Sequence, residues 1–105
     1  MNVYYARTST DNQEGFSYEL DKKRKEYDLV VFDKGVSGSV DFTERDGGKR
    51  IMEMLTSGEI TKLTTKEFSR IGRTISNTLT ILDKFRGKGV CVRIEGLGLD
   101  SIVDG

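Results

Sequence analysis

Short hydrophobic runs alternate with longer amphipathic stretches along this chain. Four runs have the β-branched and aromatic content typical of strands, at residues 2–8, 29–32, 60–65 and 90–94. Helical spacing and helix start and stop signals predict helices over residues 17–27, 49–56 and 73–86. Strands that alternate with helices pair in parallel through right-handed crossovers. The pattern therefore predicts a three-layer α/β domain, a mostly parallel sheet flanked by helices.

The expected helix over residues 73–86 has the clearest periodicity. Its apolar side is formed by Ile75, Leu79 and Leu82 at one helical spacing, with Ile81 and Phe85 beside them. Ser17 is the expected N-cap of the helix over residues 17–27. Residues 34–48 are rich in glycine, serine and aspartate without periodicity, so we expect a mobile loop there. Residues 95–105 are expected to form a loose tail.

The length and composition of the chain indicate the size of the domain and where the protein is expected to be located. The chain has 105 residues, 35% hydrophobic and 32% charged, which fits one soluble domain with a modest core. No run is as long as a membrane span, and Met1 leads straight into a strand rather than a signal peptide. We therefore expect a cytoplasmic protein without a membrane partner. Cys91 is the only cysteine and there is no histidine, which excludes an internal disulfide and argues against structural zinc. We expect Cys91 in the core.

The charge balance gives the chain no overall attraction to DNA. It has 17 basic and 17 acidic side chains, a net charge of +0. The one basic run, Lys22-Lys23-Arg24-Lys25, is surrounded by acidic residues, which favours a solvated helix face over a DNA contact. Binding to nucleic acid would need a local concentration of positive charge or a second domain.

Candidate chemistry begins where the first strand ends. The run Tyr4-Tyr5-Ala6-Arg7-Thr8-Ser9 places Ser9 at the C-terminal edge of the sheet, where open α/β sheets bind ligands. Without histidine, a nucleophilic Ser9 depends on other groups that stabilise negative charge, and arginines are the candidates. The alternative is that Ser9 is only a turn or capping residue.

A second polar segment follows the third expected strand. Arg70 and Arg73 would lie on neighbouring helical positions if a helix starts there. Guanidinium is planar, permanently charged and able to hold two phosphate oxygens at once. A serine and a pair of arginines at strand ends therefore suit a phosphodiester better than a carbonyl.

The ordered set of motifs resembles the catalytic domain of the serine recombinases, the resolvases and invertases, over nearly the whole chain. In chain order the motifs are Tyr5-Ala6-Arg7-Thr8-Ser9-Thr10 with Gln13, Asp33-Lys34 followed by Ser37-Gly38, Glu44-Arg45, Gly58, and Ser69-Arg70-Ile71-Gly72-Arg73. Glu14-Gly15-Phe16 and Phe68-Ser69-Arg70 look more like the large, phage-type members. The resemblance implies a strand order of 2-1-3-4. It also implies that residues 1–105 are a catalytic domain without the family's long dimerisation helix and DNA-binding domain.

The resemblance further implies a DNA recombinase of a phage or mobile element, acting in integration, inversion or resolution. Ser9 would attack a phosphodiester and form a 5′-phosphoseryl intermediate, with DNA as partner, dimers that pair into tetramers, and no metal or other cofactor. The charge-balancing residues would be Arg7, Arg45, Arg70 and Arg73. Gln13 and Asp33 would support them. Asp33 would orient an arginine, although a strand-end cap is an equal interpretation.

One departure leaves the proton transfers unassigned. Small resolvases commonly have an aspartate immediately before the first arginine of the pair, where this chain has Ser69. A carboxylate there could take part in proton transfer. The general acid and base therefore have no candidate.

Two other functions stay open at this point. The chain could be a catalytically silent or truncated homologue that modulates full-length recombinases by hetero-oligomerisation. It could also be an unrelated phosphate-binding α/β domain, a phosphatase or nucleotide binder, although it has no G-x-x-x-x-G-K-[ST] or G-x-G-x-x-G loop.

Overall fold

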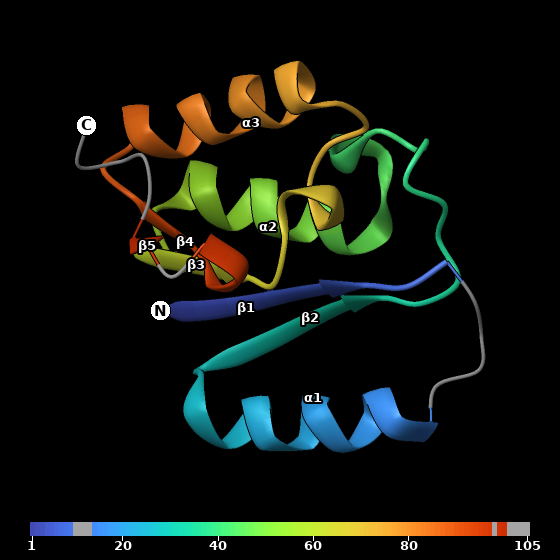
Figure 1. The fold of residues 1–105 in the computed structure, drawn as a ribbon. Helices are drawn as coiled ribbons and strands as arrows, with labels where there is room; N and C mark the ends of the chain where they lie inside the picture. Colours follow the sequence, from blue (N-terminus) through green and yellow to red (C-terminus); the bar gives the residue numbers. More distant parts are fainter. Residues whose placement is uncertain (10–13, 98, 101–105) are drawn as a thin grey trace.

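The computed structural model of the chain describes residues 1–9, 14–97 and 99–100 (Figure 1). Its strands are β1 (Asn2–Arg7), β2 (Leu29–Asp33), β3 (Lys62–Thr65), β4 (Cys91–Ile94) and β5 (Leu99–Asp100). Its helices are α1 (Glu14–Glu26), α2 (Asp46–Ser57) and α3 (Ile75–Gly87). Three short 3-10 turns are η1 (Phe42–Glu44), η2 (Phe68–Arg70) and η3 (Glu95–Leu97). The four predicted strands and three predicted helices are confirmed.

The sheet has the order β2-β1-β3-β4-β5, and its first four strands are parallel. The expected order 2-1-3-4 is therefore confirmed. The expectation of a loose tail from residue 95 onward is wrong for η3 and β5. Strand β5 pairs antiparallel with β4 through only two residues, too few to show a period in the sequence. In the register, Arg7 lies opposite Asp33 and Tyr5 lies opposite Thr65, so the three neighbouring strands β2, β1 and β3 end at one edge.

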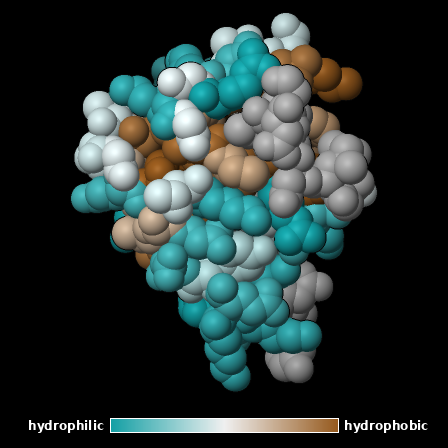
Figure 2. All heavy atoms as spheres, turned by 90° about the vertical axis from the view of Figure 1, so that its left-hand side faces the viewer, coloured by the Kyte–Doolittle hydropathy of each residue, from teal (hydrophilic) through white to brown (hydrophobic). Residues whose placement is uncertain are grey.

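Helices cover both faces of the sheet unequally. Figure 1 shows α2 and α3 on one face and α1 alone on the other. The larger core cluster includes Val3 and Tyr5 of β1, whereas Tyr4 and Ala6 pack with Leu20 of α1. This alternation follows from the two-residue period of a strand. In Figure 2 the lower part of the visible face is mostly hydrophilic, which fits the highly polar sequence of α1.

The sheet face on the α1 side also explains the partial burial of Cys91. This residue is half-buried rather than in the core as expected. Val92 and Ile94 alternate with Cys91 along β4 and are buried in the larger cluster. Cys91 therefore points to the other face, which has only one helix.

Two helix boundaries differ from the sequence prediction. Helix α2 begins at Asp46, inside the segment expected to be a loop, because Gly47 and Gly48 hide its first turn from pattern analysis. A Cβ at Gly47 would lie 2.7 Å from both Asp33 and Val31, so this glycine reflects close packing against β2. The expected N-cap Ser17 is also wrong, because α1 begins at Glu14 and Ser17 lies within it.

Helix α3 buries a different stripe from the one predicted. Ile81, Leu82 and Phe85 are buried as expected, but Ile75 and Leu79 are 73% and 44% exposed. The buried stripe is completed by Thr78 instead, whose hydroxyl donates to the Thr74 carbonyl at 2.9 Å. Ile75 and Leu79 therefore lie on the flank of the stripe rather than at its centre. In the described residues, no helix is long and apolar enough to cross a membrane.

Leu82 and Leu79 provide a matched test of this helix orientation. Leu82→Ala should reduce the free energy of unfolding by about 2–5 kcal/mol, because it leaves a cavity in the core. Leu79→Ala should change it by no more than about 0.5 kcal/mol, because that side chain is largely in solvent. Urea unfolding of both variants measures the difference. Equal losses would contradict the orientation of α3.

Candidate active site

Ser9 lies at the C-terminal edge of the sheet, directly after β1, and is exposed. The main chain of Thr8, directly before it, is fixed to the end of β2 and to the residues that follow β2. The Thr8 amide donates to the Asp33 carbonyl at 3.2 Å, and the Val36 amide donates to the Thr8 carbonyl at 2.9 Å. A rigid strand end therefore presents an accessible hydroxyl.

Arg7 is the last residue of β1, and its side chain is almost completely buried. Its guanidinium donates to the Val36 carbonyl at 2.7 Å and to the Ser69 carbonyl at 3.4 Å. Within the described part of the chain, its buried Nε finds no acceptor. Burial, together with the charges of Arg45 and Arg70, lowers the pKa of Arg7. The site thus gathers positive charge against its own repulsion.

Arg45 is the largest of the fully buried side chains and only 2% exposed. Its Nη1 donates to the Arg70 carbonyl at 2.6 Å and to the Tyr5 hydroxyl at 3.1 Å. Its Nε donates to the Val40 carbonyl at 2.9 Å, and its Nη2 donates to the Gly38 carbonyl at 3.4 Å. Arg45 therefore fastens the loop after β2 to the segment after β3.

Tyr5 connects Arg45 to Asp33. The Tyr5 hydroxyl accepts from Arg45 and donates to Asp33 Oδ2 at 2.7 Å. Burial, reinforced by this bond to Asp33, raises the pKa of Tyr5, so the phenol keeps its proton. Asp33 Oδ1 accepts from the Gly47 amide at 2.7 Å, in the first turn of α2. By hydrogen bonds between described residues, Asp33 is therefore linked to Arg45 through Tyr5, and it also caps the main chain at the start of α2.

Arg70 ends the turn η2 and is half-buried. Its Nη1 donates to the Arg7 carbonyl at 2.7 Å. Arg7 precedes Ser9 by two residues, and two residues of chain span at most about 7 Å. The Arg70 guanidinium is therefore held close to the candidate nucleophile.

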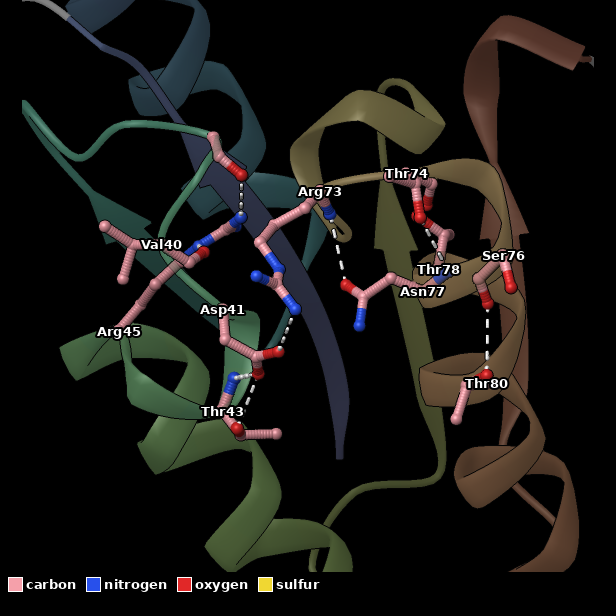
Figure 3. Close-up of polar contacts among 11 residues, drawn as sticks. Val40, Asp41, Thr43, Arg45, Arg73, Thr74, Ser76, Asn77, Thr78 and Thr80 are labelled. Carbon is pink, nitrogen blue, oxygen red and sulfur yellow. Dashed lines mark hydrogen bonds and ion pairs between the residues drawn. The ribbon is translucent and has the colours of Figure 1, made fainter.

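Arg73 lies on the approach to α3, and its side chain is 52% exposed. Its amide donates to Asn77 Oδ1 at 3.1 Å, and its Nη2 lies 3.7 Å from Asp41 Oδ2 (Figure 3). The expected helical spacing of Arg70 and Arg73 is wrong, because α3 begins later, at Ile75. The two arginines occupy a turn and a connecting segment instead.

A close approach shapes the connection between the two arginines. A Cβ at Gly72 would lie 2.1 Å from the Thr78 hydroxyl and 2.5 Å from the Thr78 amide. Only glycine therefore lets this segment pack against α3. Beside it is a cleft of about 450 Å³, lined by Arg7, Gly38, Phe68, Ser69, Gly72, Arg73, Thr74, Ile75 and Thr78.

Sequence reasoning missed a carboxylate beside these arginines. The Ser69 hydroxyl donates to Glu67 Oε2 at 3.1 Å, and that oxygen lies 3.9 Å from Arg70 Nε. Ser69 itself replaces the expected aspartate, so Glu67 supplies a negative group at this end of β3. Only its nearness in sequence to Arg70 could have indicated it. Gln13, the other predicted supporting residue, lies outside the described residues.

The Tyr5 hydroxyl bridges two buried charged groups, so removing it should be costly. Tyr5→Phe should reduce the free energy of unfolding by about 1–3 kcal/mol, because buried oxygen and nitrogen atoms of Asp33 and Arg45 lose a partner. Tyr27→Phe, on the α1 side of the sheet, is the control and should change it little. An equal effect of both substitutions in urea unfolding would disprove the bridging role.

Asp41 should make stability depend on acidic pH. Thr43 donates to its Oδ1 from the hydroxyl at 2.6 Å and the amide at 3.0 Å, and these bonds hold the pKa of Asp41 below its usual range. A carboxyl with a depressed pKa stabilises the fold above its unfolded pKa of about 3.9, and this contribution is lost as pH falls through the folded pKa. The denaturation midpoint of Asp41→Asn should therefore fall less between about pH 5 and pH 2 than that of the wild type. Parallel pH curves would refute this.

Comparison with known proteins agrees with the geometry. The family described as the resolvase N-terminal domain matches residues 2–101. No curated protein sequence matches the chain. This family match overturns the interpretation of the chain as an unrelated phosphate-binding domain.

Solved structures share the fold. The N-terminal catalytic domain of TP901-1 integrase is 19% identical, with 95% of this chain and 81% of that one covered and a TM-score of 0.74. The protein of the first open reading frame in transposon ISC1904 from Sulfolobus solfataricus is 23% identical, with 90% of this chain and 66% of that one covered and a TM-score of 0.71. A resolvase family site-specific recombinase from Streptococcus pneumoniae is 26% identical, with 96% and 76% covered and a TM-score of 0.67. With the match over residues 2–101, the fold and the strand-end serine and arginines place this chain in the resolvase N-terminal domain family, the catalytic domain of the serine recombinases.

Proposed function

We propose that Ser9 is the nucleophile with which this catalytic domain cleaves and rejoins DNA in site-specific recombination. The observation that carries the proposal is the edge of the sheet where β1 ends. There an exposed Ser9 follows a fixed strand, and Arg7 precedes it by two residues. The side chain of Arg70 donates a hydrogen bond to the main-chain carbonyl of Arg7. Permanent positive charge beside an accessible hydroxyl suits attack on a phosphodiester.

The reaction is a transesterification. The Ser9 oxygen forms a bond to phosphorus, the bond from phosphorus to the 3′ oxygen breaks, and the proton of Ser9 is transferred while the leaving oxygen gains one. The product is a 5′-phosphoseryl ester and a free 3′ hydroxyl. The ester keeps the bond energy, so a 3′ hydroxyl from another strand reverses the step. Glu67 is the nearest carboxylate to Arg70 among the contacts described and is a candidate for proton transfer.

The arginines divide into two roles in this proposal. The first role is to supply donors to the phosphate oxygens as negative charge develops. It belongs to Arg7 and Arg73, which line the cleft, and to Arg70, which is bonded to the end of β1. All three nitrogens of Arg45 donate to groups of the protein, so it acts by holding the loop and the Arg70 segment in place. Arg45 adds positive charge to the site from a position without direct access to DNA.

The proposed partners are DNA and further copies of the recombinase. The net charge of +0 gives the chain no overall attraction to DNA, so its affinity for DNA would come from the local cluster of arginines or from another domain. Dimers that pair into tetramers would bring two DNA duplexes together. The exposed Ile75 and Leu79 of α3 offer apolar surface that such an assembly can bury. A cytoplasmic location fits this substrate.

A trapping assay tests the nucleophile. The domain is fused through a family-type long helix to a DNA-binding module of known site and mixed with nicked DNA that bears paired sites. We expect a detergent-resistant, protease-sensitive protein–DNA species from the wild type and none from Ser9→Ala. Ser9 is exposed, so the alanine variant should remain folded. An adduct that survives Ser9→Ala would refute the assignment.

Arg73 and Arg24 form a matched pair for the charge-balancing role. Both guanidiniums are about half exposed and both lie near an aspartate, but Arg24 is on α1. In the same fusion, Arg73→Gln should slow adduct formation by roughly a hundredfold, the typical effect of losing one such donor. Arg24→Gln should leave the rate unchanged. Equal rates for the two variants would exclude Arg73 from the reaction.

A further inference from the structure

Three of the four site arginines bind the same short stretch of chain, which we call the 36–41 loop. Arg7 donates to the Val36 carbonyl at 2.7 Å. Arg45 donates to the carbonyls of Gly38 and Val40, and Arg73 lies 3.7 Å from the Asp41 carboxylate. The loop therefore provides acceptors to three of the arginines on which the proposed reaction depends.

Asp41 differs from the other acceptors in this loop because it carries a full negative charge. Its two oxygens have separate partners. Oδ1 accepts from the amide and hydroxyl of Thr43, which fixes the carboxylate at the start of η1. Oδ2 faces Arg73, as Figure 3 shows, and the side chain of Asn77 also lies close enough to help lower the pKa of Asp41.

Arg73 is held in two ways, and only one of them involves its charge. Its amide bonds to Asn77, and Thr74 in turn accepts from the Asn77 amide at 3.0 Å, so the main chain is fixed to the start of α3. Its half-exposed side chain is directed by Asp41 alone among the ion pairs of the described residues. A guanidinium on a fixed backbone with one weak charged partner can move to another anion nearby.

We infer that Asp41 is a positioning residue that holds Arg73 on the 36–41 loop and competes with the DNA phosphate for it. The inference rests on the proposed function and deepens it. While the cleft holds no phosphate, the carboxylate pairs with Arg73 and keeps its side chain near the site. When a phosphodiester enters, Arg73 exchanges one anion for the other, and Asp41 keeps its Thr43 bonds at the start of η1.

The inference predicts that removing the charge of Asp41 strengthens phosphate binding. Asp41→Asn retains an oxygen acceptor for Thr43 but removes the competing charge. Exposed ion pairs contribute little, so we expect inorganic phosphate to bind about two- to fivefold more tightly than to the wild type. A residue with a purely structural role would give the opposite result, because its loss would loosen the site.

The test is a titration of the 105-residue chain with inorganic phosphate, followed through the NMR signals of the arginine Nε–H groups. Two variants serve as controls. Asp21→Asn makes the same change in net charge on α1, where Asp21 pairs with Arg24, and should leave the affinity unchanged. Thr43→Val removes the hydroxyl bond to Asp41 but retains the carboxylate that faces Arg73, and it should also bind like the wild type.

Tighter binding by Asp41→Asn alone supports the inference. Equal or weaker binding by Asp41→Asn overturns it, and so does tighter binding by Thr43→Val, which would trace the effect to the turn. Absence of any phosphate shift at Arg73 in all four proteins overturns it as well, because Asp41 would then have no competitor. The trapping assay with Ser9 reports on the proposed function separately, so an adduct combined with unchanged phosphate affinity would overturn the role of Asp41 alone.

Discussion

The buried guanidinium of Arg45 is the constraint on which the geometry of this site depends. A buried charge without partners costs several kcal/mol, so the chain must keep acceptors around it. They come from the 36–41 loop, from Tyr5 in β1 and from the carbonyl of Arg70. Burying one arginine therefore ties together three segments that lie far apart in the sequence.

The other arginines extend this arrangement. Arg45 binds the main chain of Arg70, and the Arg70 side chain binds the main chain of Arg7. Arg45 thus fixes the backbone that carries Arg70, and Arg70 fixes the backbone of Arg7, two residues before Ser9. Burial and then the positive charges of Arg45 and Arg70 lower the pKa of Arg7, and the carboxylate of Asp33 offsets part of this shift. A neutral chain can in this way concentrate positive charge at one edge of its sheet.

Sequence predicted the elements well where a period was present. The strands and their order followed from short apolar runs and the family resemblance. Periodicity alone could not fix the centre of the buried stripe on α3, because Ile75 and Leu79 fit the helical spacing as well as Leu82 does but lie on its flank. Gly47 and Gly48 were predicted to lie in a loop. Glycine is needed at these positions because they pack closely against β2 and η1, and such a tertiary contact leaves no pattern in the sequence.

The candidate site was predicted only in part for a similar reason. Ser9 and the arginines stand out by residue type and by their place at strand ends. Tyr5, Asp41 and Glu67 do not, because each acquires its role from a partner elsewhere in the fold or from the local turn it occupies. Residue chemistry identified the charged groups, whereas the structure identified what holds them.

The proposed reaction requires the Ser9 oxygen to form a covalent bond to DNA. The most direct measurement is mass spectrometry of the trapped adduct after digestion with nuclease and trypsin. Trypsin releases residues 8–22 as one peptide, which contains the hydroxyl groups of Thr8, Ser9, Thr10, Ser17 and Tyr18. We expect a nucleotide remnant on this peptide, and fragmentation of the peptide should assign it to Ser9. A remnant on any other residue would contradict it.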